Sequence, residues 1–527
     1  MTFMSRQPLP TSTQRQRVYR IAIIMAWAVT FGPPSVLSSQ QATAPITAAG
    51  TALALSLAEA LRLATGTSET ISLARAGVLR STGQQLQARS QLMPQLSAGL
   101  NWQKTLQNQF QAISKKSNSG SKTGGGSDTS TIANNPLTKI FASPYTTSFA
   151  VTASQPVFTG GRASANIRAA RVNRESAEIG ITTAQAQVQL DVTEAYYDAL
   201  LADRLVTIAE SSLVQTERTL RQVQLTKNVG SASEFELIRA RVTRDNQRPS
   251  WLQSRTNRDL AYVRLRQLLN VAPDQTVRLT DDIAESPASA PFVESTVPIT
   301  TVNVSPAEVL RADPRVGAEV SKVLASADTS VPVRAPVRQA VKSVEVAKLQ
   351  LKSTKAQRYP TVSLSTNYQR LAYPNDGLPR SLGDFFPNWT AGFGVSFPFF
   401  TGGRVHGEEL AAQATVLEAE QRLKQTEEGA ALDARQTIAQ LEQAQASWQA
   451  TVGTAEQATR AYDIAEVRFR EGISTQLELA ETRVQLQQAL ANRAKAARDV
   501  QVARIRLQLL RDLPLAPSRP STTGNTP

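Results

Sequence analysis

One five-residue sequence, Phe-Thr-Gly-Gly-Arg, occurs twice in the chain, at residues 158–162 and again at residues 400–404. The offset of 242 residues between the two copies also relates Gly230 to Gly472. Each copy follows a stretch that alternates like a β-strand, and each precedes a long run without proline. A register that is kept from this corner to a distant glycine predicts two copies of one rigid unit, which is an internal repeat.

The repeat and the composition divide the chain of 527 residues into five predicted segments. A basic stretch followed by the apolar run Ile21–Phe31 is typical of a secretory signal, because a membrane-spanning helix needs roughly twenty apolar residues. A short membrane anchor is the alternative interpretation of this run. The predicted segments are a signal peptide at 1–38, a first repeat at 39–270, a connector at 271–334, a second repeat at 335–511 and a disordered tail at 512–527.

Each repeat is predicted to contain two β-strands. In residues 96–103 apolar side chains alternate with Ser, Gly, Asn and Gln, and the pattern returns at 362–369. Further alternating stretches at 149–153 and 389–397 lead into the Gly-Gly pairs. Apolar residues on one face, small polar residues on the other and aromatic residues at the ends are typical of a barrel wall in lipid. A strand half-buried on a soluble core would alternate in the same way.

Two very long helices are predicted by the proline-free runs at residues 163–228 and 405–471. At ~1.5 Å per residue each would be about 100 Å long. Residues 232–270 and 475–510 are predicted to return in the opposite direction. Helices of this length cannot bury themselves in one compact chain, so they need coiled-coil neighbours.

Shorter helices are predicted before the strands. The first runs from Leu55 to Ala64 with Ser56 as its N-cap, and residues 304–313 repeat its sequence pattern. A second helix at 69–92 has a partner at 335–357. The order of elements is then the same in both repeats.

Four strands in one chain cannot close a membrane barrel, and an open sheet edge is not viable in lipid. Closure needs about eight or more strands, so the chain is predicted to form a ring of copies. Three copies would supply twelve strands and twelve long helices. The expected fold class is a mixed α/β membrane protein: a trimeric 12-stranded β-barrel that continues into a long α-helical coiled-coil barrel. The small polar strand face suits a water-filled lumen.

The composition excludes several classes of function. With no Cys, one His (His406) and four Met, the chain offers no disulfide, no thiolate metal site and no thiol nucleophile. It contains no phosphate-binding loop and no usable catalytic constellation. The net charge is +14, but the Arg residues are spread among Gln and Glu along helical runs. We therefore expect no enzyme activity, no cofactor, no metal and no nucleic-acid partner.

The motifs taken together resemble the TolC-like outer-membrane efflux proteins. The matching features are Leu-Ser-Leu-Ala-Glu-Ala-Leu-Arg-Leu-Ala at 55–64, the two proline-led strands, the doubled Phe-Thr-Gly-Gly-Arg and the glycine turns. The resemblance covers roughly residues 52–511. It implies a homotrimeric channel-tunnel in the outer membrane that extends into the periplasm and docks onto a periplasmic adaptor (membrane fusion protein) and an inner-membrane pump. Such ducts are passive and gated at the periplasmic tip, and they export drugs, proteins by type I secretion, or polysaccharides.

The resemblance also assigns roles to residues near the glycine turns. The adaptor-docking tip would consist of Val229, Gly230, Ser231, Gly472, Ile473 and Ser474. Just beyond the second turn, Glu478 and Glu481 share one helix face, and in a trimer they would supply six carboxylates. A ring of acids favours cations, so the pair is predicted to form the pore constriction. An ordinary solvated acidic pair is the alternative.

Family members often lock the closed tip with a Tyr–Arg–Asp network, which this chain matches only in part. Its acid corresponds to Glu236, but Phe469 and Ser474 occupy the Tyr and Arg positions. Arg468 or Arg470 could substitute for the missing arginine.

Two other classes of protein remain as alternatives. A periplasmic coiled-coil adaptor or scaffold without a pore would also contain helical hairpins, although one hairpin with lipoyl-like flanks is expected there. A secreted fibrous protein would not need alternating strands that end in aromatic residues.

Overall fold

The computed structural model divides the chain into two units, Met1–Thr51 and Ala52–Pro527. All residues that it describes belong to the second unit: 53–106, 143–272, 275–283, 320–325, 327–374 and 377–516. The predicted signal peptide and the predicted helix at 304–313 lie outside the described residues, as does most of the predicted tail.

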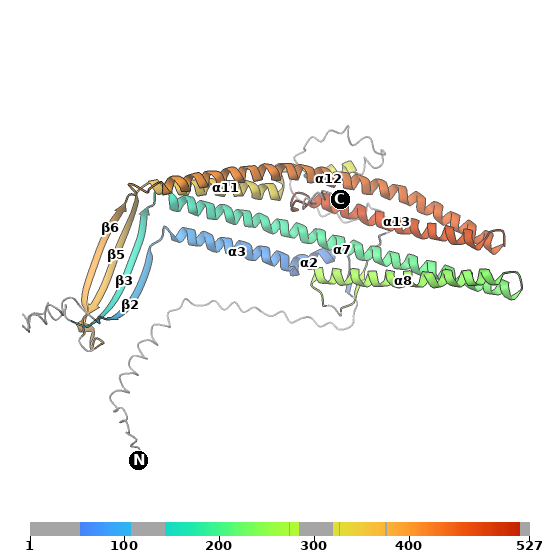
Figure 1. Cartoon of the computed structure of the whole chain (residues 1–527), viewed down its shortest axis with the longest axis horizontal. Coiled ribbons are helices and arrows are strands. Elements are labelled where there is room, and N and C mark those ends of the chain that lie inside the picture. Colours follow the sequence, from blue (N-terminus) through green and yellow to red (C-terminus); the bar gives the residue numbers. More distant parts are fainter. Residues whose placement is uncertain are drawn as a thin grey trace, which may run out of the picture. The chain divides into compact units, whose positions relative to one another are not determined.

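Four strands form one antiparallel sheet in the order β2-β3-β5-β6 (Figure 1). Their bounds are Gln95–Lys104 for β2, Tyr145–Phe158 for β3, Thr361–Ala372 for β5 and Phe386–Ser396 for β6. The central pair joins β3 of the first repeat to β5 of the second. The two repeats therefore share one sheet, and β2 and β6 are its edges.

The register of this sheet brings the apolar residues of all four strands to one face. Leu100 lies opposite Phe149, and Val151 lies opposite Tyr368. Tyr368 in turn lies opposite Trp389. Because side chains alternate with a period of two, the intervening small polar residues gather on the other face. The two-faced sheet predicted from the alternation is thus confirmed.

Two long helical hairpins make up most of the remaining structure. α7 (Arg162–Asn228) packs against α8 (Glu234–Leu269), and α12 (Arg404–Arg470) packs against α13 (Gln476–Leu509). α7 and α12 each have 67 residues, so each is about 100 Å long at ~1.5 Å per residue. α13 also packs against α7, so the hairpins contact each other. No helix within the described ranges has the length and apolar character required to cross a membrane.

Three shorter helices flank the long ones, namely α2 (Leu57–Thr67), α3 (Glu69–Ser90) and α11 (Ala335–Lys355). α3 packs against α7, and α11 packs against both α7 and α12. The hydroxyl of Ser56 accepts a hydrogen bond from the backbone N–H of Glu59 (3.3 Å), which confirms the predicted N-cap.

The predicted start of the first helix at Leu55 is wrong. Leu53–Leu55 forms a short strand, β1, that pairs in parallel with β4 (Val277–Leu279) in the connector. Leu55 is fully buried, and its carbonyl accepts from the backbone N–H of Thr280 (3.1 Å). Three residues are too few to show an alternating pattern, so the sequence carried no sign of this strand.

The largest buried core lies around Tyr196 in the middle of α7. The Tyr196 hydroxyl donates to the carboxylate of Asp281 (2.8 Å), and the same carboxylate oxygen accepts from the backbone N–H of Leu57 (3.0 Å). Burial and the neighbouring carboxylate raise the pKa of Tyr196 far above its ordinary value. This network joins the start of the first repeat, the long helix and the connector.

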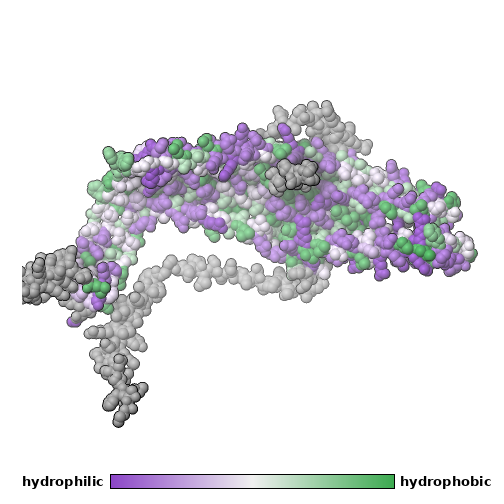
Figure 2. All heavy atoms as spheres, in the orientation of Figure 1, coloured by the Kyte–Doolittle hydropathy of each residue, from purple (hydrophilic) through white to green (hydrophobic). Residues whose placement is uncertain are grey.

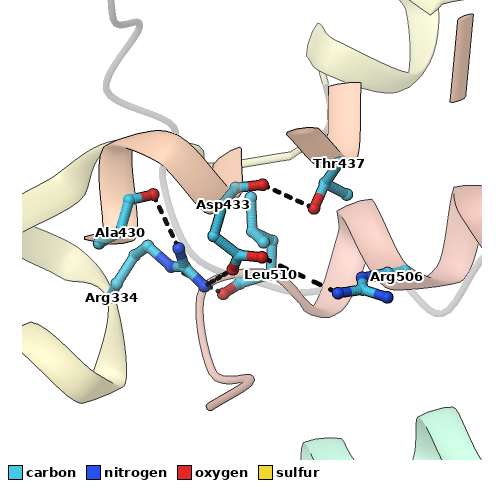
Figure 3. Close-up of polar contacts among 6 residues, drawn as sticks. All are labelled: Arg334, Ala430, Asp433, Thr437, Arg506 and Leu510. Atoms are coloured by element: carbon cyan, nitrogen blue, oxygen red, sulfur yellow. Dashed lines mark hydrogen bonds and ion pairs between the residues drawn. The ribbon is translucent and has the colours of Figure 1, made fainter. Parts of the chain in front are cut away.

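A second buried cluster fixes the start of the second repeat (Figure 3). The guanidinium of Arg334 is completely buried and donates to Asp433 (2.7 Å). It also donates to the carbonyls of Ala430 (2.9 Å) and Leu510 (3.2 Å). Arg506 lies 3.8 Å from the other oxygen of Asp433. Every charge of the cluster is thus partnered, and the cluster ties α11 to α12 and to the end of α13.

Candidate functional site

The first long hairpin turns at Gly230, whose φ of +81° lies in the left-handed region that glycine adopts without strain. The N–H of Gly230 donates to the carbonyl of Lys227 (2.8 Å). The next N–H, that of Ser231, donates to the carbonyl of Thr226 (2.9 Å). These two bonds form the Schellman arrangement, which satisfies the last carbonyls of a helix.

The second hairpin turns in the same way at Gly472, where φ is +74°. The N–H of Gly472 donates to the carbonyl of Phe469 (3.1 Å), and that of Ile473 donates to the carbonyl of Arg468 (2.8 Å). The glycine turns that the sequence predicts between the long helices are confirmed in both repeats.

The helix after each turn begins at a hydroxyl N-cap. The hydroxyl of Ser233 accepts from the N–H of Glu236 (3.2 Å), and the Glu236 carboxylate accepts in return from the N–H of Ser233 (3.0 Å). Thr475 caps α13 by accepting from the N–H of Glu478 (3.3 Å). The capping box therefore uses the Glu236 carboxylate within its own helix end. Among the described residues, it makes no ion pair with Arg468 or with Arg470.

The residues predicted to form the docking tip lie together at the turns and are mostly exposed. The exposed members are Val229, Gly230, Ser231, Gly472 and Ile473, whereas Ser474 is half-buried. Val229 is 78% exposed and Ile473 is 69% exposed. Each turn thus offers one β-branched apolar side chain to a partner.

Of the predicted acidic pair near the second turn, only Glu478 forms an ion pair with a described residue. Arg468 on α12 lies 3.7 Å from the carboxylate of Glu478 on α13. Glu481, one turn further along α13, is exposed, and its carboxylate makes no hydrogen bond or ion pair with a residue that the structure describes. Arg470 pairs instead with Glu466 on its own helix (3.8 Å). Within one copy of the chain, therefore, Glu481 is the member of this acidic pair whose carboxylate is not neutralised by a described arginine.

Phe469 links the two hairpins by packing rather than by a polar lock. Its side chain contacts a buried cluster of the first hairpin that includes Leu220 and Leu237. It also contacts a cluster of the second hairpin that includes Tyr462 and Leu479. The residue at the predicted lock position thus holds the hairpins together through apolar burial.

Gln476 makes a second link between the hairpins, which the sequence reasoning missed. The residue is 8% exposed and lies at the start of α13. Oriented so that both polar atoms are satisfied, its amide donates to the carbonyl of Glu236 (3.3 Å) and accepts from the N–H of Ala240 (3.2 Å). The equivalent position in the first repeat is Glu234, so a comparison of the two repeats could have drawn attention to this position.

The described ranges contain no cluster of three or more His, Asp or Glu side chains that could hold a metal ion. The exposed apolar side chains of Val229 and Ile473 are suited to contact with another protein, and the Glu481 carboxylate is suited to attracting cations.

The chain consists of two tandem units, and each unit is a strand pair followed by a long helical hairpin. The sheet that the two units share has two unpaired edges in the described part of a single copy. The sequence model of the outer membrane efflux protein family matches residues 60–271 and 334–511. The chain therefore belongs to the outer membrane efflux protein family, which confirms the resemblance read from the motifs. This is a family of outer-membrane channels and not of enzymes.

Solved structures of outer-membrane channels have the same fold. The outer membrane protein VceC from Vibrio cholerae superposes with a TM-score of 0.62 at 18% identity, covering 86% of this chain and 95% of VceC. The CmeC channel of Campylobacter jejuni gives 0.65 at 13% identity, covering 86% of this chain and 85% of CmeC. The open state of the MtrE channel of Neisseria gonorrhoeae gives 0.61 at 16% identity, covering 87% of this chain and 89% of MtrE. A sequence search of curated proteins finds no match.

Proposed function

We propose that three copies of this chain form a passive outer-membrane duct that receives its substrates from an inner-membrane pump and a periplasmic adaptor. The observation that carries this proposal is the pair of free edges on the shared sheet. β2 and β6 have 10 and 11 residues, which matches the ~9–11 residues of a strand that crosses a bilayer.

The directions of the strands support closure between copies. All neighbouring strands in the sheet are antiparallel, so β2 and β6 run in opposite directions. Edge β6 of one copy can therefore pair with edge β2 of the next and keep the alternation of an antiparallel barrel. Three copies of the sheet give twelve strands, the number expected for the barrel from the sequence.

The apolar face of the sheet fits a lipid environment. Four of its large side chains are more than 70% exposed in a single copy: Leu96, Leu100, Trp389 and Phe393. At the corner between β6 and α12, Phe399 and Phe400 are about 90% exposed, at 92% and 88%. Figure 2 shows hydrophobic residues where the strands meet the long helices. Aromatic side chains at this level are typical of the boundary between lipid and water.

The helices also leave apolar residues for neighbouring copies. On α3, Leu73 and Leu79 are 73% and 74% exposed, and on α8 Ile238 and Val242 are each about half exposed. Long helices in water need partners for such residues, as in a coiled coil. A ring of three copies would cover them and continue the barrel as a helical tube.

The turns supply the gate and the docking surface in this proposal. Val229 and Ile473 would contact the adaptor, while Glu478 and Glu481 would line the constriction. Phe469, Gln476 and the pair Arg468–Glu478 would hold the tip closed within each copy.

Cysteine cross-linking tests the closure of the barrel directly, because the natural chain contains no Cys. Asn101→Cys on β2 is combined in turn with Asn388→Cys, Thr390→Cys or Gly392→Cys on β6, all on the small polar face of the sheet. We expect covalent trimers from at least one combination in outer-membrane preparations, since a disulfide forms only at Cα separations near 4.4–6.8 Å.

The matched control is Thr152→Cys with Asn367→Cys, which lie opposite each other within one copy. This pair should cross-link only inside the chain. Protein that washes off membranes without detergent, or edge pairs that never link two copies, would contradict the duct and favour a periplasmic adaptor or scaffold.

A further inference from the structure

A buried cation without a partner lies between the two hairpins. Arg483 on α13 is only 8% exposed. Its Nε is buried without a hydrogen-bond partner, and the guanidinium makes no ion pair with a residue that the structure describes. Desolvation lowers the pKa of Arg483, but a guanidinium stays protonated in proteins. The chain therefore buries a positive charge that nothing on its own described surface neutralises.

Arg483 borders a cavity of about 160 Å³ between α7 and α13. A second guanidinium, that of Arg204, also lines this cavity. The other polar side chains of the lining are uncharged and are contributed mainly by α7: Thr207, Ser211, Ser212, Gln215 and Gln487. None of the lining residues is a carboxylate. The cavity thus combines two cations with hydroxyl and amide donors.

These donors are those that bind small oxyanions. Burying an unpaired charge is unfavourable, so a counter-ion is expected wherever a cation is retained in a desolvated position. Guanidinium groups match the geometry of phosphate and sulfate oxygens, and hydroxyl groups add further hydrogen bonds. We propose that the cavity between α7 and α13 binds a free inorganic oxyanion of the phosphate or sulfate class, with Arg483 as its anchor.

The location gives the ion a structural consequence. Arg483 belongs to the second hairpin, whereas Arg204, Ser211 and Ser212 belong to the first. A bound oxyanion would therefore bridge the two hairpins within one copy, above the links made by Phe469 and Gln476. The bound ion would stabilise the packing of the two hairpins against each other.

Thermal unfolding of the full-length trimer in detergent provides the first test, with sodium sulfate or sodium phosphate as the probe. Sodium chloride at equal ionic strength controls for charge screening. The variants below control for the general stabilisation that sulfate and phosphate give by exclusion from the protein surface. A ligand that binds only the folded state raises the midpoint progressively with its concentration. We expect this rise in the natural protein and its loss in Arg483→Gln. Arg241→Gln is the matched control, because Arg241 occupies the equivalent position of the first repeat and is exposed.

An equal rise in Arg483→Gln, or no rise beyond that given by chloride in the natural protein, would overturn the proposal. A crystal of the natural protein soaked in selenate gives a second readout that needs no variant. The expected result is an anomalous peak within hydrogen-bond distance of the Arg483 guanidinium and an α7 hydroxyl. A carboxylate of a neighbouring copy in that place would refute the anion site. Neither readout depends on conductance, so failure here leaves the duct proposal standing.

Discussion

At the residue scale, Arg334 and Arg483 are two buried guanidiniums in opposite surroundings. Arg334 has a carboxylate and two backbone carbonyls within hydrogen-bond distance, so its charge is neutralised within the chain. Arg483 has hydroxyls and a cavity instead. The first side chain therefore contributes to the stability of the fold, while the second is available to a ligand.

The Arg334 cluster predicts a large loss of stability when its acid is neutralised. Asp433→Asn leaves the buried guanidinium without its counter-ion, and breaking a buried pair in this way costs about 3–5 kcal/mol. The measurement is the free energy of unfolding in denaturant. Glu466→Gln is the control, because its pair with Arg470 is exposed and worth about 0–1 kcal/mol. Equal losses of unfolding free energy in both variants would show that the buried Arg334–Asp433 pair contributes no more to stability than an exposed pair.

The Gln476 contact predicts an effect on opening rather than on folding. Gln476→Ala removes the amide that joins the start of α13 to the backbone of α8, so the hairpins should separate more readily. We expect a higher open probability in planar bilayers. The control is Gln488→Ala, since Gln488 is exposed and bonds only to Asn492 on its own helix (2.8 Å). An unchanged open probability in the Gln476 variant would remove this residue from the gate.

At the scale of elements, the repeat made the strands and long helices predictable to within a few residues. For the long helices the length of the proline-free runs carried this information, as for α12, predicted at 405–471 and found at Arg404–Arg470. The strand β1 was not predicted because it is three residues long and because its pairing with β4 depends on a distant part of the chain. The bridge at Gln476 also depends on how the helices meet, which one sequence does not record.

The two Phe-Thr-Gly-Gly-Arg corners predict unequal costs for the same substitution. Gly160 and Gly402 both have positive φ (+63° and +58°), so Ala at either position would be strained by about 1–2 kcal/mol. At Gly160 an added Cβ would lie 2.7 Å from the carbonyl oxygen of Ala356 and from Cβ of Tyr359, whereas nothing lies within 4 Å at Gly402.

Gly160→Ala should therefore lower the midpoint of thermal unfolding clearly more than Gly402→Ala does. A ranking in the opposite order would mean that the corner of the first repeat does not pack against the end of α11 as described.

At the scale of the whole molecule, the described part of a single copy leaves two sheet edges unpaired, apolar helix residues exposed and the Glu481 carboxylate near the turn without an ion pair. The proposed ring of copies would provide partners for all three, because the edges would pair, the helices would pack and the carboxylates would gather around an axis.

The most direct test is the single-channel conductance of the purified protein in planar bilayers. We predict small, cation-selective openings whose selectivity falls strongly in Glu481→Gln and less in Glu478→Gln, because Glu478 is already paired with Arg468. Glu59→Gln on α2, which also removes an exposed carboxylate, should leave selectivity unchanged. No conductance from a folded, verified trimer would contradict the duct.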